Sequence, residues 1–245
     1  MTDHPQLTAD SPPLRPEPFD LYSRAPGGSV PRLLLRTRGG GLSPVDVQRW
    51  CSGADPVDEE LLRRCRGPVL DVGCGPGRLV AALARRGTDV LGVDVAPAAG
   101  HLAEAAGARV LRASVFDPLP GEGGWATVIL ADGSVGIGGE PHLLLRRSRQ
   151  LLHPCGLLLL ETEATETDQR LIACWEDGDG RRGPWFPWAR LGVAAALRAA
   201  ERAGLRPREQ WSLQGRRFLA LTPTEGSGPA PARPALVPAA GGVAL

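Results

Sequence analysis

The sequence predicts an α/β protein built on a doubly wound, mostly parallel sheet. From Val69 onward, short apolar runs alternate with helical segments, which is the order expected when each strand is followed by a crossover helix. A glycine-rich turn follows the first apolar run, as it does in the nucleotide-binding sheets of this class. The last two strand-like runs, 208–213 and 216–221, are joined by Gln214-Gly215, and this pair predicts an antiparallel hairpin.

The first strand, turn and helix are predicted over residues 69–86. Val69–Val72 is apolar apart from Asp71, as expected at the end of a buried strand. The helix predicted over Arg78–Arg86 stops at Gly87 and directs its free N–H groups into the preceding turn. The turn has three glycines that permit positive φ angles and a close approach of ligand to backbone: Gly73, Gly75 and Gly77. Such a unit binds a nucleotide-like cofactor.

The spacing of this turn distinguishes between cofactors. A dinucleotide-binding turn has the pattern G-x-G-x-x-G, and here Arg78 stands in place of its third glycine. Asp71 lies two residues before Gly73, where its charge would repel a pyrophosphate and attract an ammonium or sulfonium group. The pattern acid-x-G-x-G-x-G resembles the first motif of class I methyltransferases, which use S-adenosylmethionine.

This resemblance covers about residues 59–221. It implies the Rossmann-like, seven-stranded methyltransferase sheet with strand order 3-2-1-4-5-7-6, the last strand antiparallel, and helices on both faces. It also implies the residues that contact the cofactor, which are Asp71, Gly73, Cys74, Gly75, Gly77, Asp94, Val95, Ser114, Val115 and Ala131.

Asp94 closes the second predicted strand, Thr88–Val93, and stands 21 residues after Gly73. A carboxylate at this point accepts hydrogen bonds from both ribose hydroxyls of a nucleoside cofactor. This role is common to adenosyl and nicotinamide cofactors, so it does not distinguish between them. A structural alternative is that Asp94 caps a helix that begins near Pro97.

The third predicted strand, Ala108–Ala113, leads into Ser114 and Val115. The resemblance implies an acidic residue at the position of Ser114, accepting from the adenine amino group, and an apolar neighbour packed on the ring. A serine hydroxyl is also an acceptor, so the contact is weakened and not lost. The alternative is an ordinary turn at the end of a strand, with Asp117 ahead of Pro118.

The fourth predicted strand, Trp125–Ala131, ends at Asp132 and a glycine-rich loop. Ligands of open α/β sheets bind beyond the carboxyl ends of the strands, so this loop is expected at the rim of the site. The resemblance places the fourth methyltransferase motif here, beside the methyl group that is transferred. Asp132 is therefore the candidate general base for acceptors that must lose a proton. The alternative is that its carboxylate only orders the loop.

Three further elements complete the predicted sheet. A helix is expected at 143–152 after Pro141, a buried fifth strand at 156–161, and an alanine-rich helix at 193–203 that ends before Gly204.

Two segments outside the predicted sheet and its helices are candidates for determining acceptor specificity. Residues 19–66 contain a predicted hairpin (33–37 and 42–47) and a helix at 58–65, and they form either a cap over the site or a stabilising flap. The loop 162–190 holds an aromatic cluster that either binds the acceptor or anchors the loop. With His142, which opens the helix beside the fourth motif, the candidate acceptor residues are Trp185, Phe186, Trp188 and Arg190.

The length and composition of the chain support one α/β domain between two tails. The chain has 245 residues, 42% of them apolar, which is enough for a single core. We expect disordered tails at 1–18 and 223–245, a cap at 19–66 and a methyltransferase domain at 67–222. The start lacks the basic and apolar regions of a signal peptide, and no apolar run is long enough to span a bilayer. We therefore expect a cytoplasmic protein that does not contact a membrane.

Charge and cysteine content limit the kinds of substrate and ligand that the protein is expected to bind. All 28 basic residues are arginine and the net charge is only +1, so no basic excess favours a nucleic-acid substrate. The five cysteines form no C-x-x-C pair, which argues against a disulfide framework and a metal site. A small-molecule acceptor remains.

We therefore predict an enzyme that transfers a methyl group from S-adenosylmethionine to a small molecule by in-line displacement. The alternatives are an NAD-linked oxidoreductase and a non-catalytic, adenosyl-binding module of the same fold.

Overall fold

The computed structural model describes residues 32–96 and 107–224. The predicted N-terminal tail (1–18), most of the predicted C-terminal tail (from 225) and the helix expected near Pro97 lie outside these residues. Among the described residues, no helix has both the length and the apolar character needed to cross a membrane.

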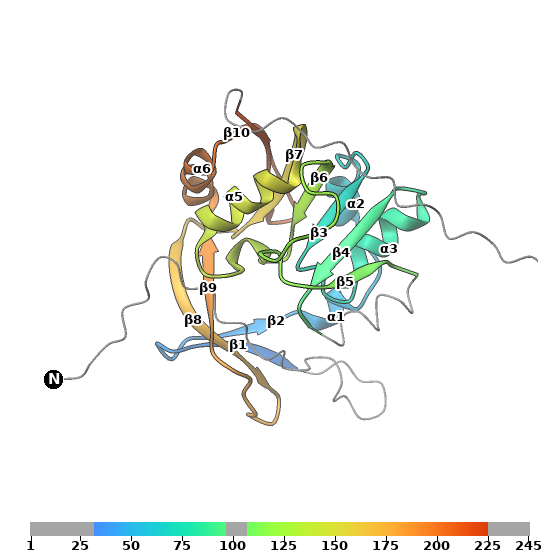
Figure 1. Cartoon of the computed structure of the whole chain (residues 1–245). Helices are drawn as coiled ribbons and strands as arrows, with labels where there is room; N and C mark the ends of the chain where they lie inside the picture. The colour runs from blue at the N-terminus through green and yellow to red at the C-terminus, as the bar shows by residue number, and fades with distance from the viewer. Residues whose placement is uncertain (1–31, 97–106, 225–245) are drawn as a thin grey trace, which may run out of the picture.

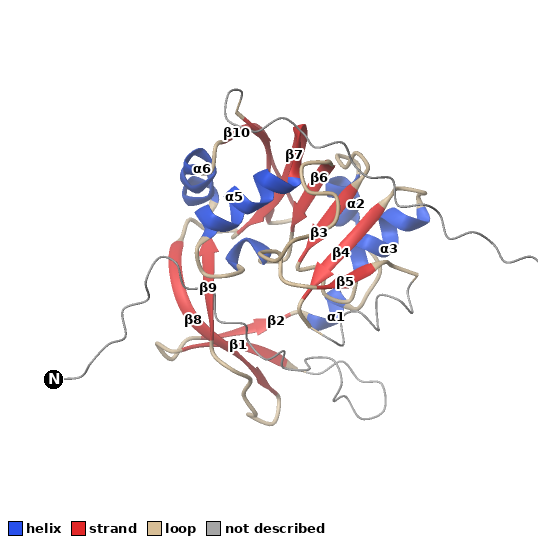
Figure 2. Ribbon diagram, in the orientation of Figure 1, coloured by secondary structure: helices blue, strands red, loops and turns tan. Residues whose placement is uncertain are grey.

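A seven-stranded sheet forms the larger part of the molecule (Figure 2). Its order is β10-β11-β7-β6-β3-β4-β5, which is 3-2-1-4-5-7-6 when its strands are numbered along the chain. The last strand, β11, is antiparallel to both neighbours, so the predicted topology is confirmed. The strands are β3 (Val69–Val72), β4 (Val90–Asp94), β5 (Val110–Arg112), β6 (Trp125–Leu130), β7 (Leu152–Thr162), β10 (Leu205–Leu213) and β11 (Arg216–Pro223).

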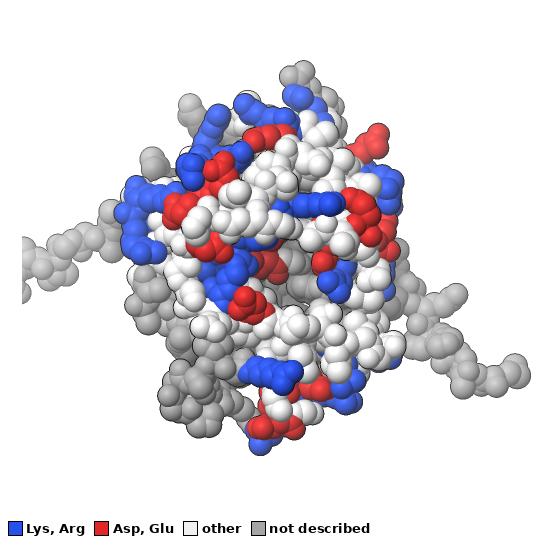
Figure 3. Space-filling model, turned by 180° about the vertical axis from the view of Figure 1, so that it is seen from behind, with Lys and Arg blue, Asp and Glu red and all other residues white. Residues whose placement is uncertain are grey.

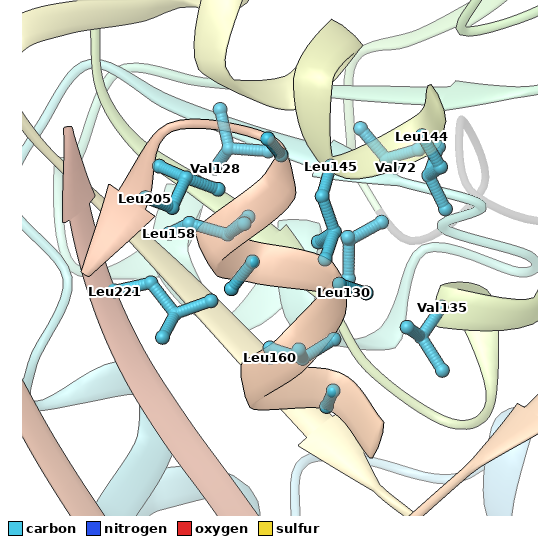
Figure 4. Close-up of a cluster of buried hydrophobic side chains, with 14 of the residues drawn as sticks. Val72, Val128, Leu130, Val135, Leu144, Leu145, Leu158, Leu160, Leu205 and Leu221 are labelled. Carbon is cyan, nitrogen blue, oxygen red and sulfur yellow. The ribbon is translucent and has the colours of Figure 1, made fainter. Parts of the chain in front are cut away.

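Helices cover both faces of this sheet, as Figure 1 shows. Helices α5 (Pro141–Leu151) and α6 (Val193–Arg202) pack on one face, and α2 (Pro56–Leu62) and α3 (Arg78–Arg85) on the other. Alternate residues of β6 pack into the cores on the two faces of the sheet. Val128 and Leu130 belong to the first core, and Ile129 belongs to the second. Figure 4 shows the first of these cores. The alternation follows from the two-residue period of a strand that is buried on both faces.

Helix α2 begins earlier than the residue at which the sequence pattern placed it. The Asp55 side chain accepts from the N–H groups of Val57 and Asp58, both at 2.8 Å, and the Asp58 carboxylate accepts from the Asp55 N–H at 3.0 Å. This reciprocal capping box, with Pro56 at the first helical position, fixes the start of the helix.

A second, four-stranded sheet lies beside the first, with the order β2-β1-β8-β9 (Figure 1). The predicted hairpin is present as β1 (Leu33–Thr37) and β2 (Leu42–Val45), followed by the short helix α1 (Val47–Trp50). The expectation of a loop at 162–190 was wrong, because it contains β8 (Asp168–Asp177) and β9 (Phe186–Leu191). Strand β8 pairs with β1, so the two segments predicted separately form one sheet.

The loop after β6 joins the two sheets. It contains a 3-10 turn, η2 (Ser134–Gly136), which contacts β9. A Cβ atom added at Gly136 would lie 2.2 Å from the Ala189 carbonyl oxygen and within 3 Å of the Trp188 ring. Glycine therefore permits the close approach of the second sheet to the loop.

This contact gives a stability test. Gly136→Ala should lower the free energy of unfolding by about 1–3 kcal/mol, since backbone and a packed ring must move to admit the methyl group. Gly39→Ala is the control, because no atom lies within 4 Å of its added Cβ. Urea unfolding of both variants measures the difference, and equal stability of the two would contradict the packing of β9 on this loop.

Candidate functional site

One large cavity lies between the carboxyl ends of the parallel strands and the second sheet. Its volume is about 860 Å³, near the upper end of the range for small-molecule sites. Its lining comes from β3, β4, β5 and β7 and the segments after them, from the loop after β6, from α1, from the start of β11, and from β1, β2, β8 and β9. The space therefore suits two small molecules bound side by side.

The glycine turn forms one wall, with the backbone angles that the sequence predicts. The φ angles of Gly73, Gly75 and Gly77 are +70°, +52° and +81°. The N–H groups of Gly73 and Cys74 donate to the Val93 carbonyl at 2.8 and 3.2 Å, which fixes the turn against β4. Gly73 and Gly75 line the cavity, whereas Gly77 is the N-cap of α3 and does not.

Cys74 is a packing residue in this turn. A Cβ atom at Gly92 would lie 2.6 Å from its sulfur, so the thiol fills the space that the glycine of β4 leaves. Burial raises the pKa of the Cys74 thiol well above its ordinary value. The thiol is therefore protonated at neutral pH and is not a nucleophile.

Asp94 ties the glycine turn to the end of β4. Its carboxylate accepts from the N–H groups of Gly75 at 2.9 Å and Ala96 at 2.8 Å. Burial raises its pKa in spite of these bonds. Each carboxylate oxygen has a second lone pair, so Asp94 retains the capacity to accept from a bound ligand.

Asp71 is a buried carboxyl group at the cavity wall. It is 3% exposed, and no side-chain hydrogen bond joins it to another described residue. Burial, together with the negative charges of Asp132 and Asp94, raises its pKa to about 8. A cation bound in the cavity would reverse this shift, because an opposite charge favours the ionised form.

The far end of the cofactor side is formed by the turn after β5. The Ser114 hydroxyl accepts from the Phe116 N–H at 3.2 Å, and the Ser114 N–H donates to the Asp117 carboxylate at 3.2 Å. Val115 is buried beside it, and both residues line the cavity. Val95 and Ala131 line it as well.

A group of seven charged side chains lies at another part of the wall, and we call it the arginine–carboxylate network. Five of them line the cavity, and Asp55 and Asp58 do not. Asp58, which is fully buried, accepts from Arg49 and Arg216, both at 2.9 Å, and forms an ion pair with Arg78. Arg216 also binds Glu161 at 2.7 Å. The members are Arg49, Arg78, Arg216, Asp55, Asp58, Asp132 and Glu161.

Asp132 lines the cavity, but this network occupies its carboxylate. It forms ion pairs with Arg49 and Arg78, and its N–H donates to Glu161 at 2.8 Å. Burial opposes its charge, but Arg78 and Arg49 outweigh that effect and lower the pKa of Asp132 below its ordinary value. A carboxylate held in this way has little tendency to accept a proton, which favours a structural role over that of general base.

Four aromatic side chains line the cavity where α1 and the second sheet border it, and we call them the aromatic wall: Trp50, Trp175, Phe186 and Trp188. The Trp175 ring centroid lies 6.3 Å from that of Trp50, 5.7 Å from that of Phe186 and 6.5 Å from that of Trp188. The wall therefore joins α1 to β8 and β9. Phe186 and Trp188 were predicted, and Trp50 was missed because nothing in its own segment shows that it meets a strand far along the chain.

Three other candidate acceptor residues differ in their positions. Trp185 is 37% exposed, does not line the cavity, and lies beside the Arg38 guanidinium at 5.6 Å. His142 is beside Glu140 on α5 and does not line the cavity either. Arg190 does line it, but its guanidinium forms two bonds to Glu163 at 2.8 and 3.0 Å.

Comparison with known proteins places the chain in a family. A family model described as "Methyltransferase domain" matches residues 46–211, which is more than half of the chain. The ubiquinone biosynthesis O-methyltransferase of Azorhizobium caulinodans is 38% identical over 112 residues, 43% of this chain and 44% of that protein. The chain thus spans less than half the length of the curated relatives it matches.

Solved structures share the fold. A Bacteroides fragilis S-adenosylmethionine-dependent methyltransferase, in complex with S-adenosylhomocysteine, matches with a TM-score of 0.68 and 21% identity, over 79% of this chain and 88% of that one. A Burkholderia thailandensis 1,6-didemethyltoxoflavin-N1-methyltransferase matches with a TM-score of 0.54 and 20% identity, over 74% and 82%. The chain belongs to the methyltransferase-domain family, the class I methyltransferases whose methyl donor is S-adenosylmethionine.

The network gives a second stability test. Asp58→Ala should lower the free energy of unfolding by about 3–5 kcal/mol, because it removes the fully buried carboxylate that three guanidinium groups share and leaves them only their remaining partners. Glu59→Ala on the same helix is the control. Its side chain is 42% exposed and pairs with Arg86 at the surface, so its loss should cost less than about 0.5 kcal/mol. Similar midpoints of urea unfolding for the two variants would show that the network does not stabilise the fold.

Proposed function

We propose that this chain, as a member of the methyltransferase-domain family, transfers the methyl group of S-adenosylmethionine to a small organic acceptor bound in the same cavity. One observation carries the proposal. The glycine turn, Asp71 and Asp94 open into a cavity of about 860 Å³ whose opposite side is the aromatic wall. A nucleoside cofactor and a second, flat molecule can therefore meet within it.

We propose the following roles on the cofactor side. Asp94 binds the ribose hydroxyls, Asp71 lies near the cationic methionyl end, and Ser114 and Val115 border the adenine. Each role fits a property of the side chain: acceptor capacity at Asp94, an uncompensated buried carboxyl at Asp71, and a hydroxyl beside an apolar surface in the turn after β5. The residues proposed to contact the cofactor are Asp71, Gly73, Cys74, Gly75, Asp94, Val95, Ser114, Val115 and Ala131. Gly77 does not line the cavity and acts by ending the turn at the start of α3.

The reaction needs alignment more than acid–base chemistry. S-adenosylmethionine supplies a methyl group on a positively charged sulfur, and the acceptor atom must approach it in line. Effective concentration and exclusion of water provide most of the acceleration in such a displacement. We propose that the network fixes the loop after β6 and that the aromatic wall positions the acceptor. Asp132 then orders that loop and does not remove a proton.

Two features support a small acceptor. The names of two matched proteins refer to ubiquinone biosynthesis and to 1,6-didemethyltoxoflavin, and neither names a macromolecular acceptor. Acidic and basic side chains are interspersed over the face in Figure 3, and the net charge is +1. A phosphate backbone would favour a continuous basic surface instead.

We also propose that residues 19–66 act as a cap on a methyltransferase domain at 67–222. The cap contributes Trp50 to the aromatic wall and Arg49 to the network. It therefore supplies surface to the acceptor without lying on the glycine turn.

The cofactor is tested by calorimetric titration. S-adenosylhomocysteine should bind with a micromolar Kd, and Asp94→Ala should weaken it by about 10-fold or more, because a buried polar contact to the ribose is lost. Glu59→Ala is the control and should bind like the native protein. Tighter binding of NAD than of S-adenosylhomocysteine would contradict the proposal and favour an oxidoreductase.

The raised pKa of Asp71 gives a pH test. In the empty site this carboxyl is mostly protonated below pH 8, and a bound ammonium or sulfonium group should lower its pKa. Binding of S-adenosylmethionine at pH 7 should therefore release nearly one proton, and affinity should rise with pH up to about 8 and then level off. Calorimetry in buffers of different ionisation enthalpy measures the release. Asp71→Asn should abolish it; the same release from that variant would assign the proton to another group.

A further inference from the structure

The charges around the acceptor side of the cavity restrict which acceptor can be methylated. Within the network, three guanidinium groups face four carboxylates. Arg190 is neutralised by Glu163. Asp55 and Asp58 do not line the cavity, but they bind the guanidinium groups that do. The guanidinium groups beside Asp132 are therefore each already bound by carboxylates.

Asp46 adds a further carboxylate at the cavity. It is the N-cap of α1 and accepts from the Arg49 N–H at 2.9 Å. No arginine pairs with it among the residues that the structure describes. The four-residue helix that it caps ends at Trp50, so an unneutralised carboxylate and the aromatic wall border the same space.

An acceptor that reacts through oxygen meets two obstacles here. A phenol has a pKa near 10, so it must lose a proton to become a strong nucleophile, and the guanidinium groups that could stabilise the anion are already bound by carboxylates. The cavity lining contains no His, Lys or Tyr among the described residues. Its carboxylates Asp132, Glu161 and Glu163 are each held by arginine.

An amine must lose a proton as well, but its nucleophilic form is neutral, so no anion has to be stabilised, and its resting form is a cation. Tryptophan faces attract ammonium groups, and the attraction grows when the pair is shielded from water. Three of the four members of the aromatic wall are tryptophans. Asp46 supplies the opposite charge at the same end of the cavity.

We propose that the acceptor is a small amine, bound as a cation between the aromatic wall and Asp46 and methylated on nitrogen. This inference rests on the proposed function. The ammonium first loses a proton to water. Its nitrogen lone pair then forms the bond to the methyl carbon, while the C–S bond breaks and its electron pair passes to sulfur. The nitrogen gains the positive charge, and the methylated ammonium leaves with S-adenosylhomocysteine as the second product.

Three probes of one shape and different charge test the binding step: choline, 3,3-dimethylbutan-1-ol and 3,3-dimethylbutyrate. Titrations followed by saturation-transfer NMR are made on the protein with and without S-adenosylhomocysteine. Choline should bind about 10-fold more tightly than the neutral alcohol, and the anion should bind most weakly. Equal affinity for choline and the alcohol, preference for the anion, or no binding of choline at millimolar concentrations would overturn the proposal.

Variants locate the site. Asp46→Asn and Trp175→Leu should each weaken choline binding by about 3- to 10-fold while leaving the affinity for S-adenosylhomocysteine unchanged. Asp46 is exposed and its asparagine variant keeps an N-cap, so it is informative even if Trp175→Leu is unstable. Trp185→Leu is the matched control, because Trp185 lies outside the cavity lining. Equal loss in that control would overturn the assignment.

Turnover gives an independent readout. In an assay of S-adenosylhomocysteine formation, phenethylamine should be methylated in preference to catechol, and the reverse preference would overturn the proposal. Failure to bind S-adenosylhomocysteine would instead contradict the proposed function. The choline preference is also measured without that ligand, so the two failures are distinguishable.

Discussion

Arg78, whose side chain is 3% exposed, carries a charge that is costly to bury unless opposite charges lie within hydrogen-bonding distance. Asp58 and Asp132 provide them, and each also binds Arg49 and Arg216. Since Arg49 follows the second sheet's hairpin, Arg78 begins α3 and Arg216 begins β11, these bonds hold the cap, the glycine turn and the terminal hairpin together. None of these segments can shift without separating buried charges. The shape of the cavity depends on this requirement.

The cavity has two kinds of wall. The residues of the glycine turn are fixed by hydrogen bonds, namely those of Gly73 and Cys74 to Val93 and that of Gly75 to Asp94. The aromatic wall comes from α1, β8 and β9, which belong to segments outside the parallel sheet. Under the proposed function, substitutions in the aromatic wall alter the acceptor while the glycine turn keeps its geometry. This arrangement agrees with the general rule that function resides in sites added to a fold that many proteins share.

The parts that could be predicted from the sequence are those set by neighbouring residues. The glycine turn follows from its φ requirements, and the order of the main sheet follows from alternating strands and helices together with a family resemblance. Strands β8 and β9 could not be found in this way, since β8 pairs with β1 through contacts between residues such as Leu35 and Trp175 that lie far apart in the chain. The network was missed for a related reason: its arginines resemble solvated surface residues until four separate segments bring their partners together.

Arg78 bears on both the cofactor and the structure of the site. In the sequence it stands where a dinucleotide-binding turn has its third glycine, which argues against such a turn. In the structure its side chain lies at the start of α3 and binds the carboxylate of Asp132, which follows β6. That carboxylate is bound by arginines, and the φ of +53° at Asp132 is maintained by the bonds on either side. Bonds of this kind within the protein reduce the ordering that binding would otherwise require. Under the proposed function, the acceptor meets a rim held by these bonds, and selection among acceptors depends on the charge and shape of that rim.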